Sequence, residues 1–295
     1  MDAGDLRVFE TVARAGGMNR AAAELNTVQS NVTARIRLLE EQLGVPLFRR
    51  HSRGVALTVA GERLLPYAQR IAQLLAEARR AVVEDGRPKG SLTIGSLETT
   101  AALRLPPILA AYAATYPEVD LVIGTGTTCE LIDRVLDRRI EGAFVCGPVK
   151  HADLVEQPVF DEELVLVTAP MIGRIDALIR AEDLKIVVLR AGCSYRQRLE
   201  DVLAVRGVRG LRQLEFGTID AIVGCVAAGL GVTLLPRGVV DAARRAGRIA
   251  VHDLPPREAR VQTVFIRRRD GFVSSALAAF LDAARPVAAD ADAAE

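Results

Sequence analysis

The chain has 295 residues, half of them hydrophobic and a quarter charged, and its formal net charge is +1. This length predicts roughly two domains, and apolar residues spread along the sequence exclude long disordered stretches before the Ala- and Asp-rich end that follows Pro286. So small a net charge gives no overall attraction to nucleic acid, and any DNA-binding surface must come from a local cluster of basic residues.

Simple sequence patterns argue against a secreted protein, a membrane protein, and a protein held together by metal ions or disulfides. The first five residues lack the basic and apolar regions of a secretory signal. No apolar run reaches the ~18 residues of a membrane helix, so we expect a cytoplasmic protein with no membrane partner. The cysteines are widely spaced and have no neighbouring histidine cluster, which favours neither a metal site nor a disulfide framework, and no cofactor is expected. They are Cys129, Cys146, Cys193 and Cys225.

The first 58 residues predict three short helices followed by a basic segment. Gly16 and Gly17 end the first helix, Asn19 is expected to cap the second, and a tight turn at Asn26 and Thr27 leads to the third. The apolar positions of the first and third helices repeat at helical spacing. They are Leu6, Phe9 and Val12, and then Val32, Ile36, Leu39 and Leu43.

The third helix carries polar side chains opposite its apolar face. Side chains of these types offer the donors and acceptors that read base edges in the major groove, although an ordinary solvent-exposed helix face has the same composition. Basic residues next to them suit contacts with DNA phosphates. The candidate base-contacting residues are Gln29, Ser30, Asn31, Thr33 and Arg37, and the other basic candidates are Arg35, Arg49, Arg50 and Arg53.

Residues 6–66 resemble the DNA-binding domain of LysR-type transcriptional regulators. The shared positions are Leu6, Phe9, Val12, Ala21-Ala22, Leu25, Gln29 to Thr33, Ile36, Leu39-Glu40, Leu43-Gly44, Leu47-Phe48, Arg50, Arg53, Leu57-Thr58 and Gly61. The resemblance implies that residues 1–58 form a winged helix-turn-helix that binds double-stranded operator DNA. Val28-Gln29-Ser30-Asn31 stands where the family often has Ser-Gln-Pro-Ala, and Ala34 is smaller than usual, so a relative's operator sequence cannot be transferred to this chain.

Residues 59–90 predict a long linker helix and a hinge, with Thr58 as the helix cap and an end near Asp85. An apolar stripe spaced by fours and threes runs along the helix and needs a partner. The stripe is Leu64, Ala68, Ile71, Leu75, Ala78 and Val82. We expect a homodimer, as the resemblance also implies, assembled into a homotetramer that contacts RNA polymerase. The alternative is that the stripe packs on the chain's own sensor domain.

Residues 91–295 predict an α/β domain with a mainly parallel, doubly wound sheet. The expected strands are 91–95, 121–124, 142–145, 164–168, 186–189, 214–216, 232–235 and 261–266. The family resemblance, weaker here, implies an effector domain similar to periplasmic binding proteins. Lobe 1 is then about 91–162 and 267–295, lobe 2 is about 163–266, and the chain crosses between them near Phe160–Glu163 and Val264–Arg267.

Several strand-to-helix turns carry small hydroxyl residues where an open α/β sheet binds ligands. Helix capping explains some of them equally well: Thr127 with Glu130 fits a capping box, and Thr218 fits a simple cap. Tyr195 and Arg196 suit an anion whereas Glu98 suits an amine, so an organic acid and an amino compound both stay open. The candidate effector-binding residues are Ser96, Glu98, Thr99, Thr100, Gly126, Thr127, Thr128, Gly147, Ser194, Tyr195, Arg196 and Thr218.

The sequence therefore predicts a regulator in which a small-molecule effector repositions paired DNA-binding heads. A redox-sensing regulator is the main alternative, because Cys193 lies at a helix entry that can activate a thiol. An enzyme is not expected: Gly124-Thr-Gly126 lacks the rest of a dinucleotide motif, and no catalytic residues are identified. The DNA-binding segment argues against a free-standing solute-binding protein.

Overall fold

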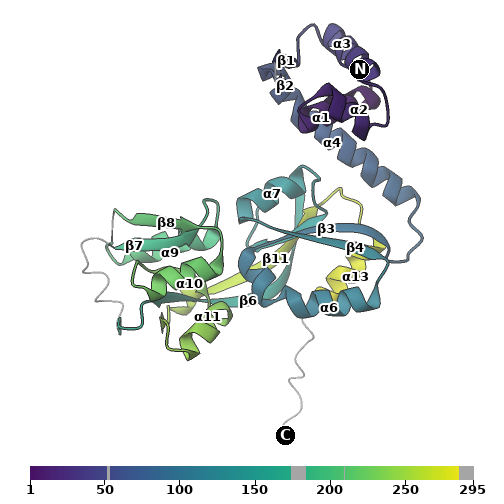
Figure 1. The fold of residues 1–295 in the computed structure, drawn as a ribbon. Coiled ribbons are helices and arrows are strands. Elements are labelled where there is room, and N and C mark those ends of the chain that lie inside the picture. Colours follow the sequence, from purple (N-terminus) through teal and green to yellow (C-terminus); the bar gives the residue numbers. More distant parts are fainter. Residues whose placement is uncertain (52–53, 174–183, 209, 286–295) are drawn as a thin grey trace. The chain divides into compact units, whose positions relative to one another are not determined.

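The computed structural model describes residues 1–51, 54–173, 184–208 and 210–285 (Figure 1). It divides into two structural units. One comprises Met1–Asp85 and Asp137–Arg139, and the other comprises Gly86–Leu136 and the chain from Ile140 onward. No helix within the described ranges is both long and apolar enough to cross a membrane.

Three helices form the N-terminal unit's head. Helix α1 (Ala3–Ala15) begins with a capping box between Asp2 and Asp5 and ends at Gly16, whose left-handed backbone suits glycine. Helix α2 (Met18–Glu24) has Gly17 at its N-cap, so the expected cap at Asn19 is wrong: extended Gly17 lets the helix start before Asn19. Helix α3 (Gln29–Leu43) ends at Gly44, which is also left-handed.

The predicted apolar faces of α1 and α3 form the core of this unit. Leu43 departs from the prediction, because it is 37% exposed. The rings of Phe9 and Phe48 pack with their centroids 5.3 Å apart. The buried members of the predicted faces are Leu6, Phe9, Val12, Val32, Ile36 and Leu39. Burial of one side of α3 fixes which side faces solvent.

A two-stranded wing follows α3. Strands β1 (Phe48–His51) and β2 (Gly54–Leu57) pair antiparallel. The Glu40 carboxylate in α3 accepts hydrogen bonds from the backbone N–H groups of Leu47 (2.7 Å) and Phe48 (3.1 Å), which ties the start of the wing to the helix. A Cβ atom at Gly61 would lie 2.3 Å from the Leu47 carbonyl oxygen, so only glycine permits the next helix to pass this close.

The linker helix α4 (Val59–Val82) begins where Thr58 accepts a hydrogen bond from the N–H of Gly61. It ends before the expected Asp85. The first part of its apolar stripe packs within its own unit. Ala68 is fully buried in the core of the N-terminal unit, and Leu64 packs against that core. Later stripe residues are exposed, and Tyr67 and Leu74 join them.

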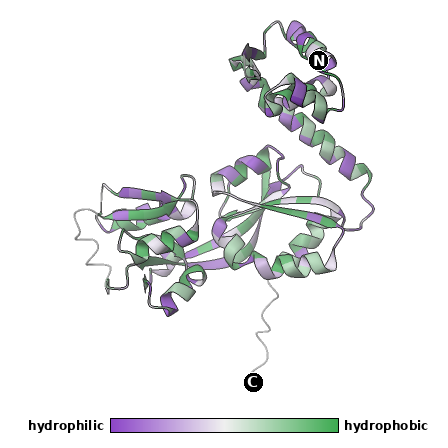
Figure 2. Ribbon diagram, in the orientation of Figure 1, coloured by the Kyte–Doolittle hydropathy of each residue, from purple (hydrophilic) through white to green (hydrophobic). Residues whose placement is uncertain are grey.

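Lobe 1 of the second unit has a parallel core. Strand β3 (Gly90–Ser96) lies between β4 (Val119–Thr125) and β5 (Gly142–Cys146) and is parallel to both. Around these strands are α5 (Glu98–Leu103), α6 (Leu105–Thr115), α7 (Thr128–Leu136) and α13 (Ser275–Ala284). Helices α6 and α13 are hydrophobic along most of their length (Figure 2), and they enclose a cluster containing Phe144, Phe265 and Phe280.

Lobe 2 is also built from strands and helices that follow one another along the chain. Its strands are β7 (Lys185–Leu189), β8 (Arg212–Phe216), β9 (Thr233–Pro236) and β10 (Ala250–His252), and β7 is parallel to β8. Its helices are α9 (Ser194–Val205), α10 (Ile219–Ala227), α11 (Arg237–Arg245) and α12 (Pro256–Ala259).

Two long strands join the lobes. Strand β6 (Leu154–Thr168) pairs antiparallel with β11 (Arg260–Arg268), and its second half also pairs with β9 and β10 in lobe 2. The sheet is therefore mixed where a mainly parallel one was expected, because the connecting strands run antiparallel. The second crossing also comes earlier than expected: Val264–Ile266 already pair with β5 of lobe 1, which puts the crossing at 260–262.

We predict that Glu40→Ala destabilises the N-terminal unit by about 1–3 kcal/mol, because two buried N–H groups lose their acceptor. Glu40→Gln is the matched control, since it keeps an acceptor oxygen, and it should cost clearly less. The measurement is urea unfolding of the full chain followed by circular dichroism. Equal losses in the two variants would contradict the assigned hydrogen bonds.

Candidate DNA-binding surface and effector cavity

The outer face of α3 presents polar side chains to solvent. Gln29, Ser30, Asn31 and Arg37 are exposed, and Thr33 is half-buried. The Gln29 amide donates to the Thr33 hydroxyl (3.1 Å), and the Asn31 amide donates to the Thr27 hydroxyl (3.0 Å). These bonds orient two side-chain amides at the start of the helix, and amides are the groups that pair with adenine edges.

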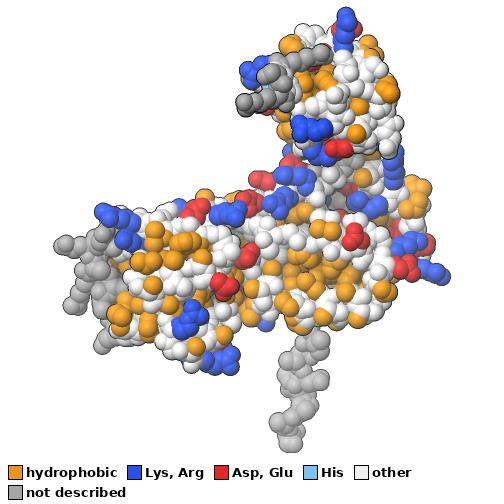
Figure 3. Space-filling model, viewed as in Figure 1, with side chains coloured by type: hydrophobic (Ala, Val, Ile, Leu, Met, Phe, Trp, Pro, Cys, Tyr) orange, Lys and Arg blue, Asp and Glu red, His pale blue; other side chains and the backbone are white. Residues whose placement is uncertain are grey.

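The basic candidates differ in the partners they have. Arg35 donates to the buried carboxylate of Asp5 (3.0 Å), so its guanidinium braces α1 against α3. Arg37 pairs with Glu41 on the exposed surface (2.8 Å). Arg49 is exposed, and among the described residues its guanidinium makes one long hydrogen bond, to the Leu57 carbonyl at 3.5 Å. Figure 3 shows Lys and Arg side chains on the surface of this unit. The side chain of Arg50 and the whole of Arg53 lie outside the described part of the chain.

A cavity of about 140 Å³ lies between the two lobes of the second unit. Seven of its lining residues were candidates from the sequence: Glu98, Thr99, Gly126, Thr127, Thr128, Ser194 and Tyr195. The others are Leu97, Thr125, Glu130, Arg134, Cys146, Leu189, Arg190, Cys193 and Gly217. The N-termini of α7 and α9 therefore meet at one cavity, as the turn positions suggested.

The two helix starts also touch each other across the lobes. The Ser194 hydroxyl of α9 donates to the Thr128 hydroxyl of α7 at 3.0 Å. A Cβ atom at Gly192 would lie 2.9 Å from the Thr127 Oγ1, and the backbone there has a φ of +90°, so glycine allows this approach. Thr127 and Glu130 form the predicted capping box, which fixes the start of α7. The cavity is thus closed on one side by a direct contact between lobes.

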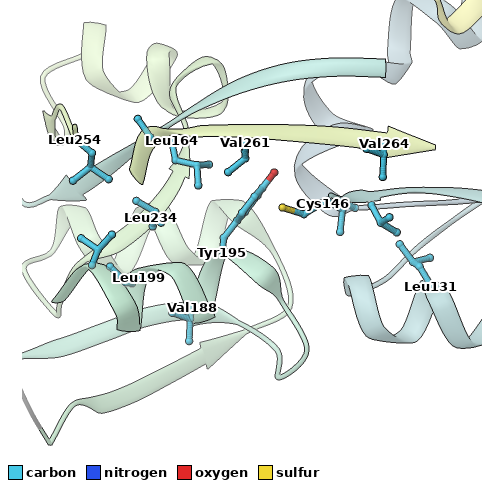
Figure 4. Packing of buried hydrophobic residues seen from close by; sticks show 14 of the residues in the cluster. Leu131, Cys146, Leu164, Val188, Tyr195, Leu199, Leu234, Leu254, Val261 and Val264 are labelled. Carbon is cyan, nitrogen blue, oxygen red and sulfur yellow. The ribbon is translucent and has the colours of Figure 1, made fainter. Parts of the chain in front are cut away.

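Two hydroxyl groups of the cavity wall, those of Thr99 and Tyr195, are buried and lie close to each other, and neither makes a well-formed hydrogen bond to any described residue. Tyr195 is 4% exposed and extends from α9, with the sulfur of Cys146 directed toward its ring (Figure 4). Burial raises the pKa of Tyr195, which keeps the phenol protonated and able to donate. Because buried polar groups are nearly always paired, these two hydroxyls are suited to bind a ligand.

Five sequence candidates lie outside the cavity wall. Ser96 and Thr100 are buried, and the Ser96 hydroxyl donates to the carbonyl of Leu97. Gly147 packs against Val264. Thr218 caps α10 by accepting from the N–H of Ala221, the simple cap that was predicted.

Arg196 is the fifth, and its charge is already balanced. The guanidinium pairs with Glu200 (3.2 Å) and Glu215 (3.3 Å), and it also donates to Gln213. Arg134 and Arg190 line the cavity in its place. Sequence reasoning missed both: Arg190 follows a strand that was predicted, but no motif marks it, whereas the spacing of Arg134 four residues after Glu130 places both on one face of α7 and was an available signal.

Two cysteines from opposite lobes line the same cavity. Burial raises the pKa of both the Cys146 and the Cys193 thiols. A thiol reacts with oxidants as the thiolate, so a raised pKa lowers the reactive fraction at neutral pH. This environment disfavours the redox-sensing alternative for Cys193.

Family comparisons agree with this architecture. A model of bacterial regulatory helix-turn-helix proteins of the lysR family matches residues 3–62, and a model of the LysR substrate-binding domain matches residues 85–289. The chain belongs to the LysR family of transcriptional regulators. The family resemblance and the fold class predicted from sequence are thereby confirmed.

Similar regulators include two from Bacillus subtilis strain 168. The HTH-type transcriptional regulator GltR is 45% identical over 276 residues, covering 94% of this chain and 93% of GltR. YusT, an uncharacterized HTH-type transcriptional regulator, is 46% identical over 287 residues, covering 97% of this chain and 96% of YusT.

Solved structures share the fold. CbnR complexed with its target DNA has a TM-score of 0.68 at 24% identity, covering 96% of this chain and 99% of CbnR. A full-length OxyR variant from Pseudomonas aeruginosa has a TM-score of 0.66 at 22% identity, covering 96% of this chain and 93% of that one. At these identities the likeness concerns the fold alone.

We predict that iodoacetamide at pH 7 alkylates the exposed Cys129 of this LysR-type regulator well before the half-buried Cys193 or the buried Cys146, because desolvation raises the pKa of these two thiols. These two thiols should gain reactivity only as the pH rises above the ordinary thiol range. Mass spectrometry of the labelled peptides gives the three rates. Alkylation of Cys193 as fast as that of Cys129 at pH 7 would reinstate the redox-sensing alternative.

Proposed function

We propose that this LysR-type regulator binds an operator with two half-sites as a homodimer, and that a small molecule in the cavity between the lobes changes that binding. The proposed parts are a DNA-binding head (residues 1–58), a linker (59–90) and an effector domain (91–295). The observation that carries the proposal is the two-sided character of α3: one face is fixed in the core while the other presents oriented polar side chains.

The placement of polar side chains on α3 supports base recognition by the head. In a helix-turn-helix, residues near the N-terminus of the second helix contact base edges, while flanking residues contact phosphates. Gln29, Ser30 and Asn31 occupy that position in α3. Arg49 on the wing suits a phosphate, because its guanidinium is exposed and its one hydrogen bond to a described residue is long. Arg35 is better assigned to bracing α1 against α3 than to DNA contact, since Asp5 already neutralises it.

The exposed part of α4 supports the homodimer. Tyr67, Ile71, Leu74, Ala78 and Val82 are exposed at spacings of four, three, four and four, and Val82 is 86% exposed. Apolar residues at such spacing form the seam between paired helices. A second copy of α4 is the occupant we propose, because two heads then face two half-sites of one operator. The proposed seam keeps Ile71, Ala78 and Val82 of the predicted stripe, with Tyr67 and Leu74 in place of Leu64, Ala68 and Leu75.

The strands between the lobes support the response to an effector. Strands β6 and β11 pass from one lobe to the other near residues 161–163 and 260–262. Closure of the lobes would bend the two strands there. A ligand that bridges the cavity favours the closed arrangement by its difference in affinity for the two arrangements. The contact between Thr128 and Ser194 adds to the stability of the closed arrangement.

We predict that base-contact and phosphate-contact variants differ in kind. Asn31→Ala and Gln29→Ala should lose about 1–3 kcal/mol of discrimination between operator and scrambled DNA, because an amide that reads a base is removed. Arg49→Ala should weaken binding to both DNAs and reduce the slope of log K against log salt by about 0.9.

Fluorescence anisotropy with labelled operator and scrambled duplexes at several salt concentrations separates these effects. Arg14→Ala is the control, because Glu10 and Glu24 already pair with Arg14 away from α3. Unchanged discrimination in both α3 variants would show that α3 does not read the bases.

We also predict that Ile71→Glu and Leu74→Glu convert the dimer to a monomer, because each places a charge in the proposed seam. Gln73→Glu adds the same charge on the other side of α4 and should remain dimeric. Sedimentation equilibrium measures the masses, and operator affinity should fall with the loss of the dimer. A dimer that persists in both seam variants would place the interface elsewhere.

A further inference from the structure

Three charged side chains line the cavity between the lobes without an ion pair to any described residue. Glu98 lies in the first turn of α5, Arg134 lies in α7, and Arg190 follows β7. Arg134 makes one long hydrogen bond, 3.5 Å, to the carbonyl of Thr125. Glu130, the fourth charged residue of the wall, keeps its negative charge while its carboxylate accepts the capping-box hydrogen bond from the N–H of Thr127. The cavity wall therefore carries charges of both signs, and Glu98, Arg134 and Arg190 form no ion pair with a described residue.

These charges disfavour a ligand of a single sign. A compound with only a carboxylate would meet Glu98 in a small, partly desolvated space, where like charges repel strongly. A compound with only an amine would meet two guanidinium groups. A compound with both groups gives each unpaired charge an opposite partner, and guanidinium groups bind carboxylates with strong, directional hydrogen bonds.

The volume of the cavity and its uncharged lining residues limit the class of ligand further. An apolar cavity of about 150 Å³ holds a molecule of the size of benzene, and this cavity measures about 140 Å³. Leu97 and Leu189 supply apolar surface for a short side chain. The adjacent hydroxyls of Thr99 and Tyr195, which make no well-formed hydrogen bond to any described residue, supply hydrogen-bonding groups for a charged end of the ligand.

We propose that the effector is a small zwitterion of the amino-acid type. Arg134 and Arg190 bind its carboxylate, and Glu98 binds its ammonium group. Arg190 belongs to lobe 2 whereas Arg134 and Glu98 belong to lobe 1, so one such molecule links the two lobes. This inference rests on the proposed function, because it takes the cavity to be the effector site.

The experiment uses the full chain and matched sets of probes. Each common L-amino acid is compared with its deamino acid and with the amine left by its decarboxylation, first by thermal shift and then by calorimetric titration. We expect at least one amino acid to stabilise the protein and to bind with a Kd at least about tenfold below those of its two analogues, a difference of about 1.4 kcal/mol.

Two variants then assign the charges. Glu98→Gln should raise the Kd of the amino acid about tenfold or more, and it should lower the Kd of the deamino acid, because the charge that repels its carboxylate is removed. Arg190→Gln should weaken both acids and lower the Kd of the amine, because one repelling guanidinium group is removed. Glu118→Gln and Arg248→Gln, which alter exposed residues of lobes 1 and 2 away from the cavity wall, should change none of the three.

The inference is overturned if no amino acid stabilises the protein, if the deamino acids or amines bind as tightly, or if Glu98→Gln keeps the preference. Its failure is distinguishable from failure of the proposed function. An acid or amine that binds the wild type and changes operator affinity removes the zwitterion assignment alone. Operator affinity that stays the same in the presence of every compound that binds removes the effector response itself.

Discussion

The antiparallel pairing of β6 with β11 is the constraint on which the effector domain depends. Both strands continue from one lobe into the other, so the lobes stay attached through a paired ribbon and can move only where that ribbon bends. The same ribbon lies beside an apolar cluster that contains residues of both lobes, including Leu131, Tyr195 and Val261 (Figure 4). This cluster and two helix starts bound the cavity in which we propose that the effector binds.

Local signals in the sequence predicted most of the elements correctly. Gly44 and Thr58 mark the ends of helices because each satisfies a backbone requirement that depends on few neighbours. The errors occur where tertiary context decides. Asn19 has the chemistry of a cap, but extended Gly17 already occupies the cap position. Strand β6 was foreseen only in its last third, because its first part contains Pro158 and lacks a regular alternation of polar and apolar residues. The second crossing depends on pairing with β5, which no local pattern reveals.

Charged residues were harder to assign than turns. The turns that carry Thr99, Thr127 and Ser194 converge on one cavity, as strand order alone implies. The role of an arginine depends instead on which carboxylate reaches it. Arg35 was predicted to contact DNA and Arg196 to bind the effector. In the structure Arg35 forms an ion pair with Asp5, and Arg196 forms one with Glu200. Arg190 has no ion-pair partner among the described residues, and only the fold shows that it lines the cavity. The same reasoning divides the α4 stripe, since Ala68 is buried by its own unit while Leu75 is 45% exposed.

The central claim is that α3 of each subunit lies in a DNA groove and that a paired linker presents two copies of it. Hydroxyl-radical footprinting of the wild-type protein on the DNA upstream of its own gene tests this most directly. The account predicts two protected segments on one face of the duplex, with centres separated by about 10 base pairs or a multiple of that spacing. One protected segment, or none at protein concentrations that saturate dimer formation, would contradict it.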